Sequence, residues 1–216
     1  MSNSTLRITE IFYSLQGETR TVGLPTVFIR LTGCPMRCVY CDTSYAFSGG
    51  ETVSIDSIMS QTEQYKARYV TVTGGEPLAQ KNCAKLLTRL CDAGYQVSVE
   101  TGGAIDIASV DPRACVVLDI KTPASGELGK NLWSNIALLK KDDQVKFVIC
   151  NRSDYEWVRF KINELDLNSR VSEILFSPSH HELSAKTLAE WIIEDRLQVR
   201  LQVQLHKILW NDEPGH

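Results

Sequence analysis

Three cysteines in one short loop constrain this chain more than any other feature. Cys34, Cys38 and Cys41 have the spacing Cys-x3-Cys-x2-Cys, and so short a loop can bring its thiolates to one metal centre at little entropic cost. A structural zinc ion takes four ligands, and so do most electron-transfer iron–sulfur clusters. Three thiolates would hold three irons of a [4Fe–4S] cluster and leave the fourth open. The spacing therefore predicts an iron–sulfur site that binds a further cofactor or substrate.

Two other interpretations of these cysteines stay open. Free cysteines are mostly small buried hydrophobes, and we interpret four others in that way: Cys83, Cys91, Cys115 and Cys150. The loop over residues 33–43 contains Gly, Pro, Arg and Asp, so it does not resemble a core segment. The second alternative is a zinc ion whose fourth ligand comes from a distant part of the chain.

The composition is that of a globular protein and argues against nucleic acid or a membrane as its partner. The 216 residues predict a single domain, 1–216, with a full hydrophobic core. The net charge is −3 and there is no long basic run, so the sequence does not predict the positively charged surface that nucleic-acid binding requires. The apolar runs are of strand length, which excludes a membrane span. Seven cysteines, an odd number, and no secretory signal predict a cytoplasmic protein without a disulfide framework.

Strand and helix signals alternate along the chain. Residues 26–32 predict a strand that leads into the cysteine loop, because Val27, Ile29 and Leu31 share one face. Further strands are predicted at 69–73, 96–100, 115–121, 144–150, 172–176 and 198–205. Helices are predicted at 54–66, 79–93, 131–140 and 184–195, and another that opens with a capping box at Ser153–Glu156.

The polar residues within these strands indicate how the sheet is shaped. Alternation of strands and helices predicts a mostly parallel sheet with crossover helices. A sheet covered on both faces should be apolar on both, but several strands are polar at alternate positions: Arg30, Thr32, Thr71, Thr73, Ser98, Glu100, Asp119, Lys121, Arg200, Gln202, Gln204 and His206. We therefore expect an α/β fold, a partial (β/α) barrel with helices outside and a polar concavity inside.

Short motifs follow the strand ends, where such folds carry their chemistry. In Gly74-Gly75-Glu76-Pro77 the glycines allow a ligand to approach the backbone, although an ordinary turn has similar residues. Glu100-Thr101 and Asp119–Lys121 are candidates for polar ligand contacts or for ordinary strand-end hydrogen bonds. His206, followed by Lys207, is either structural or functional.

The cysteine spacing together with Gly74–Pro77 resembles the radical S-adenosylmethionine (SAM) enzymes. In that superfamily an aromatic residue at the position of Tyr40 lies against the adenine. The chain resembles one family more closely, the 7-carboxy-7-deazaguanine synthases, over nearly its whole length. The segments that carry this resemblance are Phe12–Glu18, Val27–Pro35, Cys41–Thr43, Val72–Pro77, Val99–Gly102 and Gln204–Lys207.

This resemblance implies an abbreviated radical SAM barrel and a homodimer. It implies conversion of 6-carboxy-5,6,7,8-tetrahydropterin to 7-carboxy-7-deazaguanine with release of ammonia, a step of 7-deazapurine (queuosine) biosynthesis. The cofactors implied are a [4Fe–4S] cluster, SAM and Mg²⁺, with an electron donor such as flavodoxin or ferredoxin. The reactive species is a radical derived from SAM, so no side chain is assigned a catalytic role.

The resemblance also implies a set of site residues. The cluster ligands are Cys34, Cys38 and Cys41, and Thr43 contacts Mg²⁺. The SAM contacts are Tyr40, Asp42, Gly75, Glu100, Asp119, Ile120 and Lys121. The pterin contacts are Leu15, Gln16, Gly17, Arg30, Thr73 and His206. Several relatives have Ser-Pro-Lys where this chain has Asp119-Ile120-Lys121, and this departure weakens the assignment there.

Four alternatives accompany these assignments, two for single residues and two for the class of protein. Arg30 could instead form an internal ion pair with Glu100 or Asp119, and Thr43 could cap the turn after the cysteine loop. The chain could be a radical SAM activase that acts on a partner enzyme. A non-enzymatic electron carrier or zinc module would need a fourth ligand and would have no use for Gly74–Pro77.

Overall fold

Nine strands form one open sheet in the computed structural model, which describes residues 4–180, 182–211, 213 and 215. Their order is β3-β1-β2-β4-β5-β6-β7-β8-β9. Strand β1 pairs antiparallel with β2 and β3, and all other pairs are parallel. The strands are β1 (Thr5–Leu15), β2 (Pro25–Leu31), β3 (Glu51–Ser54), β4 (Tyr69–Gly74), β5 (Gln96–Thr101), β6 (Cys115–Asp119), β7 (Gln144–Ile149), β8 (Glu173–Pro178) and β9 (Arg200–Leu201).

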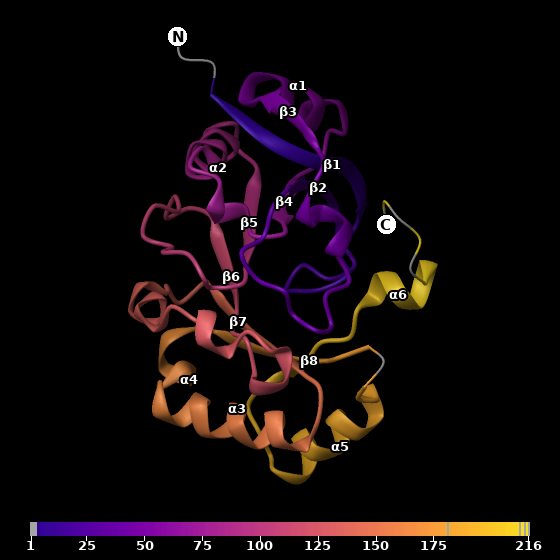
Figure 1. Ribbon diagram of the computed structural model, residues 1–216, viewed down its shortest axis with the longest axis vertical. Coiled ribbons are helices and arrows are strands. Elements are labelled where there is room, and N and C mark those ends of the chain that lie inside the picture. Colours follow the sequence, from indigo (N-terminus) through magenta and orange to yellow (C-terminus); the bar gives the residue numbers. More distant parts are fainter. Residues whose placement is uncertain (1–3, 181, 212, 214, 216) are drawn as a thin grey trace.

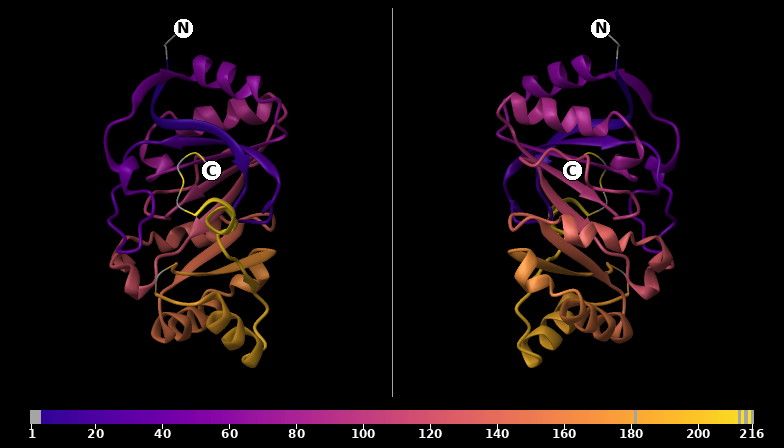
Figure 2. Two further views of the ribbon diagram at one scale, coloured as in Figure 1. Left: turned by 90° about the vertical axis from the view of Figure 1, so that its right-hand side faces the viewer. Right: turned by 90° about the vertical axis from the view of Figure 1, so that its left-hand side faces the viewer.

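The helices pack mainly on the outside of this sheet. Helix α1 contacts β1 and β3, α2 contacts β5, α3 contacts β7, and α5 contacts β8 and β9. Helix α6 lies apart from the others (Figure 1). In the view from that side it is seen nearly end-on, near the middle of the molecule (Figure 2, left). The α-helices are α1 (Ile55–Gln64), α2 (Cys83–Asp92), α3 (Arg152–Glu164), α4 (Leu167–Arg170), α5 (Ala185–Glu194) and α6 (Leu205–Trp210). The 3-10 helices are η1 (Ser44–Phe47), η2 (Pro77–Ala79), η3 (Pro123–Ser125), η4 (Leu128–Lys130) and η5 (Trp133–Leu138).

Strand β2 shows how the two faces of the sheet differ. Val27, Ile29 and Leu31 are fully buried in the core, as their alternation predicts. Phe28 and Arg30 point to the opposite face, which lines a cavity. The predicted α/β sheet of mostly parallel strands with helices outside is thereby confirmed.

Helix caps explain which helix ends were predicted correctly. Ser54 and Ser184 cap α1 and α5 by accepting hydrogen bonds from the backbone N–H of Ser57 and Thr187, as predicted. The capping box predicted at Ser153 is wrong. The side chain of Asn151 caps α3 instead, and accepts from the Asp154 N–H at 3.0 Å.

Five other elements differ from the prediction. The helix predicted at 79–93 begins only at Cys83, because Gln80 is extended after η2. Residues 131–140 contain the 3-10 helix η5 and no α-helix. The strand predicted at 198–205 is reduced to β9, and His206 lies in α6. Strands β1 and β3 were not predicted.

Among the residues that the structure describes, no helix combines the length and the apolar character needed to cross a membrane.

Candidate active site

One cavity of about 430 Å³ opens at the carboxyl ends of the parallel strands. It brings together nearly every residue that the sequence predicted for the site. The predicted residues that line it are Leu15, Gln16, Gly17, Arg30, Cys34, Cys38, Tyr40, Cys41, Asp42, Thr43, Thr73, Gly75, Glu100, Asp119, Lys121 and His206. Ile120 is different: it is 3% exposed and belongs to the hydrophobic core. The side chain of Ile120 therefore points away from the cavity, because alternate residues of an extended segment face opposite sides, and only its backbone is left for a ligand contact.

Backbone hydrogen bonds from three other segments hold the cysteine loop. Gly33 donates to the Ala46 carbonyl at 2.8 Å, and its own carbonyl accepts from the Glu76 N–H at 2.8 Å. The Val39 N–H donates to the Ser125 carbonyl at 3.1 Å. The Arg37 N–H donates to Glu127 Oε1 at 2.5 Å. The loop is thus fixed by the ends of β4 and β6 as well as by its own turn.

The three loop cysteines suit a cluster by their chemistry. Each is a free thiol, partly exposed, on the same cavity. Burial raises the pKa of Cys38 to about 11, the Lys121 ammonium opposes this rise, and the other two thiols add to it. The three sulfurs therefore act on one another electrostatically, and metal binding must displace a proton from each thiol. In the described residues no three His, Cys, Asp or Glu side chains stand close enough to hold a single metal ion.

The other four cysteines lie outside the cavity. Cys83 and Cys150 are buried, as predicted. The prediction is wrong for Cys91 and Cys115, which are only partly buried. Cys115 donates to the Asp142 carbonyl at 3.2 Å and accepts from the Gln144 amide at 3.4 Å, so it is held at the protein surface by polar contacts.

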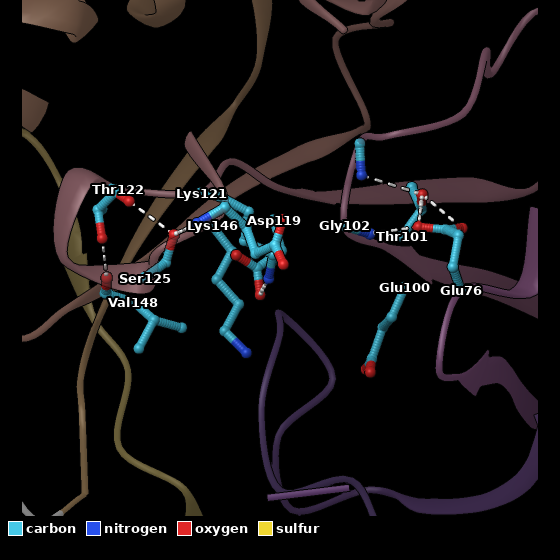
Figure 3. A network of polar contacts seen from close by, with 12 residues as sticks. Glu76, Glu100, Thr101, Gly102, Asp119, Lys121, Thr122, Ser125, Lys146 and Val148 are labelled. Atoms are coloured by element: carbon cyan, nitrogen blue, oxygen red, sulfur yellow. Dashed lines mark hydrogen bonds and ion pairs between the residues drawn. The ribbon is translucent and has the colours of Figure 1, made fainter. Parts of the chain in front are cut away.

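Glu76 has a structural role in the glycine motif. Its buried carboxylate accepts from Thr101 Oγ1 at 2.9 Å, from the Gly102 N–H at 2.8 Å and from the Leu78 N–H at 3.1 Å (Figure 3). Burial raises its pKa. Glu76 does not line the cavity, so it joins the ends of β4 and β5 and leaves ligand contacts to the glycines.

The glycines of this motif are required by close backbone packing. A Cβ on Gly75 would lie 2.3 Å from the Gly33 carbonyl oxygen, and one on Gly74 would lie 2.2 Å from that of Leu31. Gly74 also has a φ of +149°. The sequence suggested that these glycines let a ligand approach the backbone. In the structure they also let this backbone pack closely against the end of β2 and the start of the cysteine loop.

Buried polar atoms without a hydrogen-bond partner among the described residues belong to side chains that line the cavity. Lys121 pairs with Asp119 Oδ2 at 3.1 Å (Figure 3) and lies 5.9 Å from the Tyr40 ring centroid. Asp119 Oδ1, Tyr40 Oη and Ser177 Oγ are buried and make no hydrogen bond within the described residues. All three residues line the cavity. Buried polar groups are nearly always satisfied, so these atoms fit a polar ligand.

A second polar group surrounds Glu100 on the part of the cavity wall formed by β4 and β5. Thr73 Oγ1 donates to Glu100 Oε2 at 3.0 Å, and Gln16 Nε2 lies 3.4 Å from Oε1. Gln16 also donates to Thr71 Oγ1 at 3.1 Å. Burial raises the pKa of Glu100. The structure thus groups Glu100 with the predicted pterin contacts Gln16 and Thr73.

Arg30 stands near the mouth of the same wall. Its Nε donates to Glu10 Oε1 at 2.7 Å. The predicted alternative, an ion pair with Glu100 or Asp119, has the wrong partner. Arg30 also lies 5.9 and 5.8 Å from the ring centroids of Phe12 and Tyr45. These contacts fix the guanidinium while leaving its two terminal nitrogens without a hydrogen bond to another described residue.

Four further charged or polar residues line the cavity: Glu18, Lys146, Gln204 and Lys207. Gln204 was predicted on a polar strand face, and Lys207 follows the predicted site residue His206, but no site role was predicted for any of the four. Lys146 on β7 forms an ion pair with Glu18, and Gln204 bonds to Glu18 and Asp42. Lys207 pairs with Asp42 at 3.5 Å. Burial alone would raise the pKa of Glu18, but the Lys146 ammonium lowers it. The signal that could have revealed Lys146 is its place on the polar side of an otherwise apolar strand.

Gly17 and His206 meet at the edge of the cavity. A Cβ on Gly17 would lie 2.1 Å from His206 Nδ1, and the Leu205 N–H donates to the Gly17 carbonyl at 3.0 Å. Burial lowers the pKa of His206 and so favours the neutral ring, which has one hydrogen-bond donor and one acceptor.

We expect Gly17→Ala to push the His206 ring out of its place. Overpacking of this kind costs about 1–3 kcal/mol, and the KM for the substrate should rise because His206 leaves the wall. Steady-state kinetics with a thermal unfolding curve would measure both effects. The control is Gly129→Ala, where the added methyl would meet no atom within 4 Å. Equal behaviour of the two variants would contradict the role of this contact.

Comparison with known proteins agrees with this site. Residues 28–112 match the family model of the radical SAM superfamily. The chain is 41% identical to a 7-carboxy-7-deazaguanine synthase of Chlorobaculum tepidum, over 98% of this chain and 97% of the relative. It is 39% identical to one of Koribacter versatilis, over 96% of this chain and 98% of the relative. The crystal structure of QueE from Escherichia coli matches with a TM-score of 0.75 and 25% identity, covering 93% of this chain and 94% of that chain.

The partial barrel and the three-cysteine loop thus define a radical SAM protein. Within that superfamily, the chain belongs to the family of 7-carboxy-7-deazaguanine synthases.

Proposed function

We propose that this protein is a radical SAM lyase that converts 6-carboxy-5,6,7,8-tetrahydropterin to 7-carboxy-7-deazaguanine with release of ammonia, in queuosine biosynthesis. Membership of the family supports this proposal. The observation that carries it is that the cysteine loop and the polar wall around Glu100 share one cavity of about 430 Å³. A radical SAM activase is less well supported, because the polar groups of this cavity suit a small substrate.

Cys34, Cys38 and Cys41 would hold the [4Fe–4S] cluster, and SAM would bind beside it. When bound, these groups would supply the radical chemistry that the reaction needs, and the residues of the cavity would hold and orient them. Tyr40, Asp42, Gly75, Glu100, Asp119 and Lys121 remain the proposed SAM contacts. The unpartnered atoms Asp119 Oδ1 and Tyr40 Oη support this assignment, since each needs a hydrogen-bonding partner when buried. Ile120 would contribute its backbone only.

The pterin would lie against the wall around Glu100. Leu15, Gln16, Gly17, Arg30, Thr73 and His206 are the proposed contacts. Gln16, Thr73 and His206 offer hydrogen-bonding groups of the kind that a pterin ring requires. Arg30 would bind the carboxylate, because a guanidinium offers two parallel donors to it. The fixed walls orient the substrate relative to SAM and limit the access of water.

Anaerobic reconstitution with iron and sulfide, followed by incubation with SAM, a reductant and the carboxytetrahydropterin, tests this function. We expect 7-carboxy-7-deazaguanine by mass spectrometry, with ammonia in equal amount. Cleavage of SAM without consumption of the pterin would exclude this substrate. Cleavage only in the presence of a partner protein would favour an activase.

Thr43 is the proposed ligand of Mg²⁺. It lines the cavity, and its side chain does not cap the turn: Oγ1 donates to Asp42 Oδ1 at 2.7 Å. The lone pairs of the hydroxyl therefore remain available to a hard cation. A Mg²⁺ held there would also neutralise the substrate carboxylate.

We expect Thr43→Val to lose the stimulation of turnover by Mg²⁺, because valine keeps the shape of threonine and removes its oxygen. Turnover is measured against added Mg²⁺ for both proteins. Thr52→Val, in β3 outside the cavity, is the matched control. An unchanged Mg²⁺ response in Thr43→Val would show that Thr43 is not a ligand.

Three further features belong to the same proposal. A small electron carrier such as flavodoxin or ferredoxin would reduce the cluster, two copies of the chain would form a homodimer, and the protein would work in the cytoplasm. The family pattern supports the first two, and the odd number of free cysteines supports the third. Light scattering after gel filtration would determine the oligomeric state.

A further inference from the structure

The side-chain amide of Gln204 joins two walls of the cavity. Its Nε2 lies 2.9 Å from Glu18 Oε1 and 3.1 Å from Asp42 Oδ2. Glu18 follows the proposed pterin contacts Gln16 and Gly17, whereas Asp42 follows the cluster ligand Cys41. An amide NH₂ group has two hydrogens, so one side chain can serve both carboxylates.

Both carboxylates are also held from their other sides. Glu18 forms an ion pair with Lys146, which comes from β7. Asp42 Oδ1 accepts from Thr43 Oγ1 at 2.7 Å, and Oδ2 lies 3.5 Å from Lys207 Nζ. A continuous polar chain therefore runs from Thr43 through Asp42, Gln204 and Glu18 to Lys146.

The local backbone leaves Gln204 free for this bridge. It is the residue before α6, but its side chain makes no capping bond to the helix. The helix start is instead fixed by the Leu205 N–H, which donates to the Gly17 carbonyl at 3.0 Å. Without the amide donors, the carboxylates of Glu18 and Asp42 would share this part of the cavity with no bridge between them.

We propose that Gln204 is a positioning residue, which links the pterin-side wall at Glu18 to the cluster loop at Asp42 and so sets the place of the substrate relative to SAM. This inference rests on the proposed function. Radical transfer depends on a short, fixed distance between the reacting groups. A looser link would let the radical form without reaching the substrate hydrogen, and SAM would then be cleaved unproductively.

The test compares Gln204→Met with Gln198→Met. Methionine matches glutamine in length and removes both donors, and Gln198 is an exposed glutamine whose amide makes only a 3.5 Å contact to the Arg196 carbonyl. In Gln204→Met we expect kcat/KM for the pterin to fall about tenfold, the usual effect of losing a hydrogen bond to a charged group. We also expect more 5′-deoxyadenosine per molecule of product. Gln198→Met should match the native protein in both.

Hydrogen exchange supplies a readout that needs no substrate. In the reconstituted Gln204→Met protein, amides of the Gln16–Glu18 segment and of α6 should exchange faster than in the native protein. If Gln204→Met does not fold, Gln204→Asn replaces it in this experiment. Its side chain keeps the amide but is too short to reach both carboxylates, so we expect the same faster exchange.

The outcomes separate this inference from the function on which it rests. Native protein that leaves the pterin unchanged would contradict the proposed function, while the exchange data would still decide whether Gln204 links the walls. The positioning role would be overturned if a Gln204 variant had the same exchange rates as the native protein. It would also be overturned if an active Gln204 variant had the same ratio of 5′-deoxyadenosine to product as the native protein.

Discussion

Cys38→Ala is expected to abolish SAM cleavage and to reduce the iron content of the reconstituted protein to near background. Two thiolates cannot hold a cluster that needs three protein ligands and one open iron. The loop itself should survive, because the Cys41 N–H donates to the backbone carbonyl of Cys38 at 3.1 Å, and alanine keeps that carbonyl. Iron and sulfide analysis with the visible absorption spectrum measures the loss.

Two other cysteines serve as controls for this variant. Cys83 and Cys150 are buried outside the cavity, so Cys83→Ala and Cys150→Ala should retain the cluster and its absorption. Each substitution removes one thiol, as Cys38→Ala does. A cluster that survives the loss of Cys38 and disappears with Cys83 would overturn the ligand assignment.

The fold was predictable wherever the pattern was local. The alternation in β2 and the serine caps of α1 and α5 depend on residues within one turn or one strand, and the structure has them where the sequence indicates. Strand β1 was missed because most of its residues are only partly buried, and it exists through its antiparallel pairing with β2 and β3. That pairing is a tertiary contact, which propensity alone does not reveal.

The end of the chain shows the opposite error. Residues 198–205 alternate polar and apolar side chains, which predicts a strand. Only Arg200 and Leu201 pair with β8, because the chain leaves the sheet edge and Leu205 bonds to Gly17 instead. His206 therefore reaches the cavity from α6, although it was predicted at a strand end.

The site was predictable from spacing and resemblance, but its internal connections were not. The three cysteines lie within eight positions, so their convergence is a local property. Lys146 and Glu18 are 128 positions apart, and Gln204 and Glu18 are 186 apart. Pairs at such separation depend on the order of strands in the sheet, which is fixed only when the whole chain has folded. The ion pair of Arg30 with Glu10 arises in the same way, from the antiparallel register of β1 and β2.

Arg30→Lys is expected to raise the KM for the carboxytetrahydropterin by roughly 10- to 100-fold, since hydrogen bonds to a charged group contribute about 1.5–3 kcal/mol. The Glu10 contact occupies Nε alone, which leaves the two terminal nitrogens for the substrate carboxylate. Lysine keeps the charge but presents one nitrogen, so the bidentate geometry is lost. Binding of the pterin by calorimetry, together with steady-state kinetics, measures the change.

The decisive comparison for Arg30 is between substrate and cofactor. If Arg30 binds the pterin, Arg30→Lys should still bind SAM and cleave it reductively, because Arg30 is on β2, which β4 and β5 separate from β6, the strand of Asp119. Glu10→Gln is the matched control: it weakens the ion pair and leaves the guanidinium in place between Phe12 and Tyr45. A smaller rise in KM in Glu10→Gln than in Arg30→Lys would assign the effect to the substrate contact. Equal loss of SAM binding and pterin binding in Arg30→Lys would instead show that the residue supports the structure of the whole cavity.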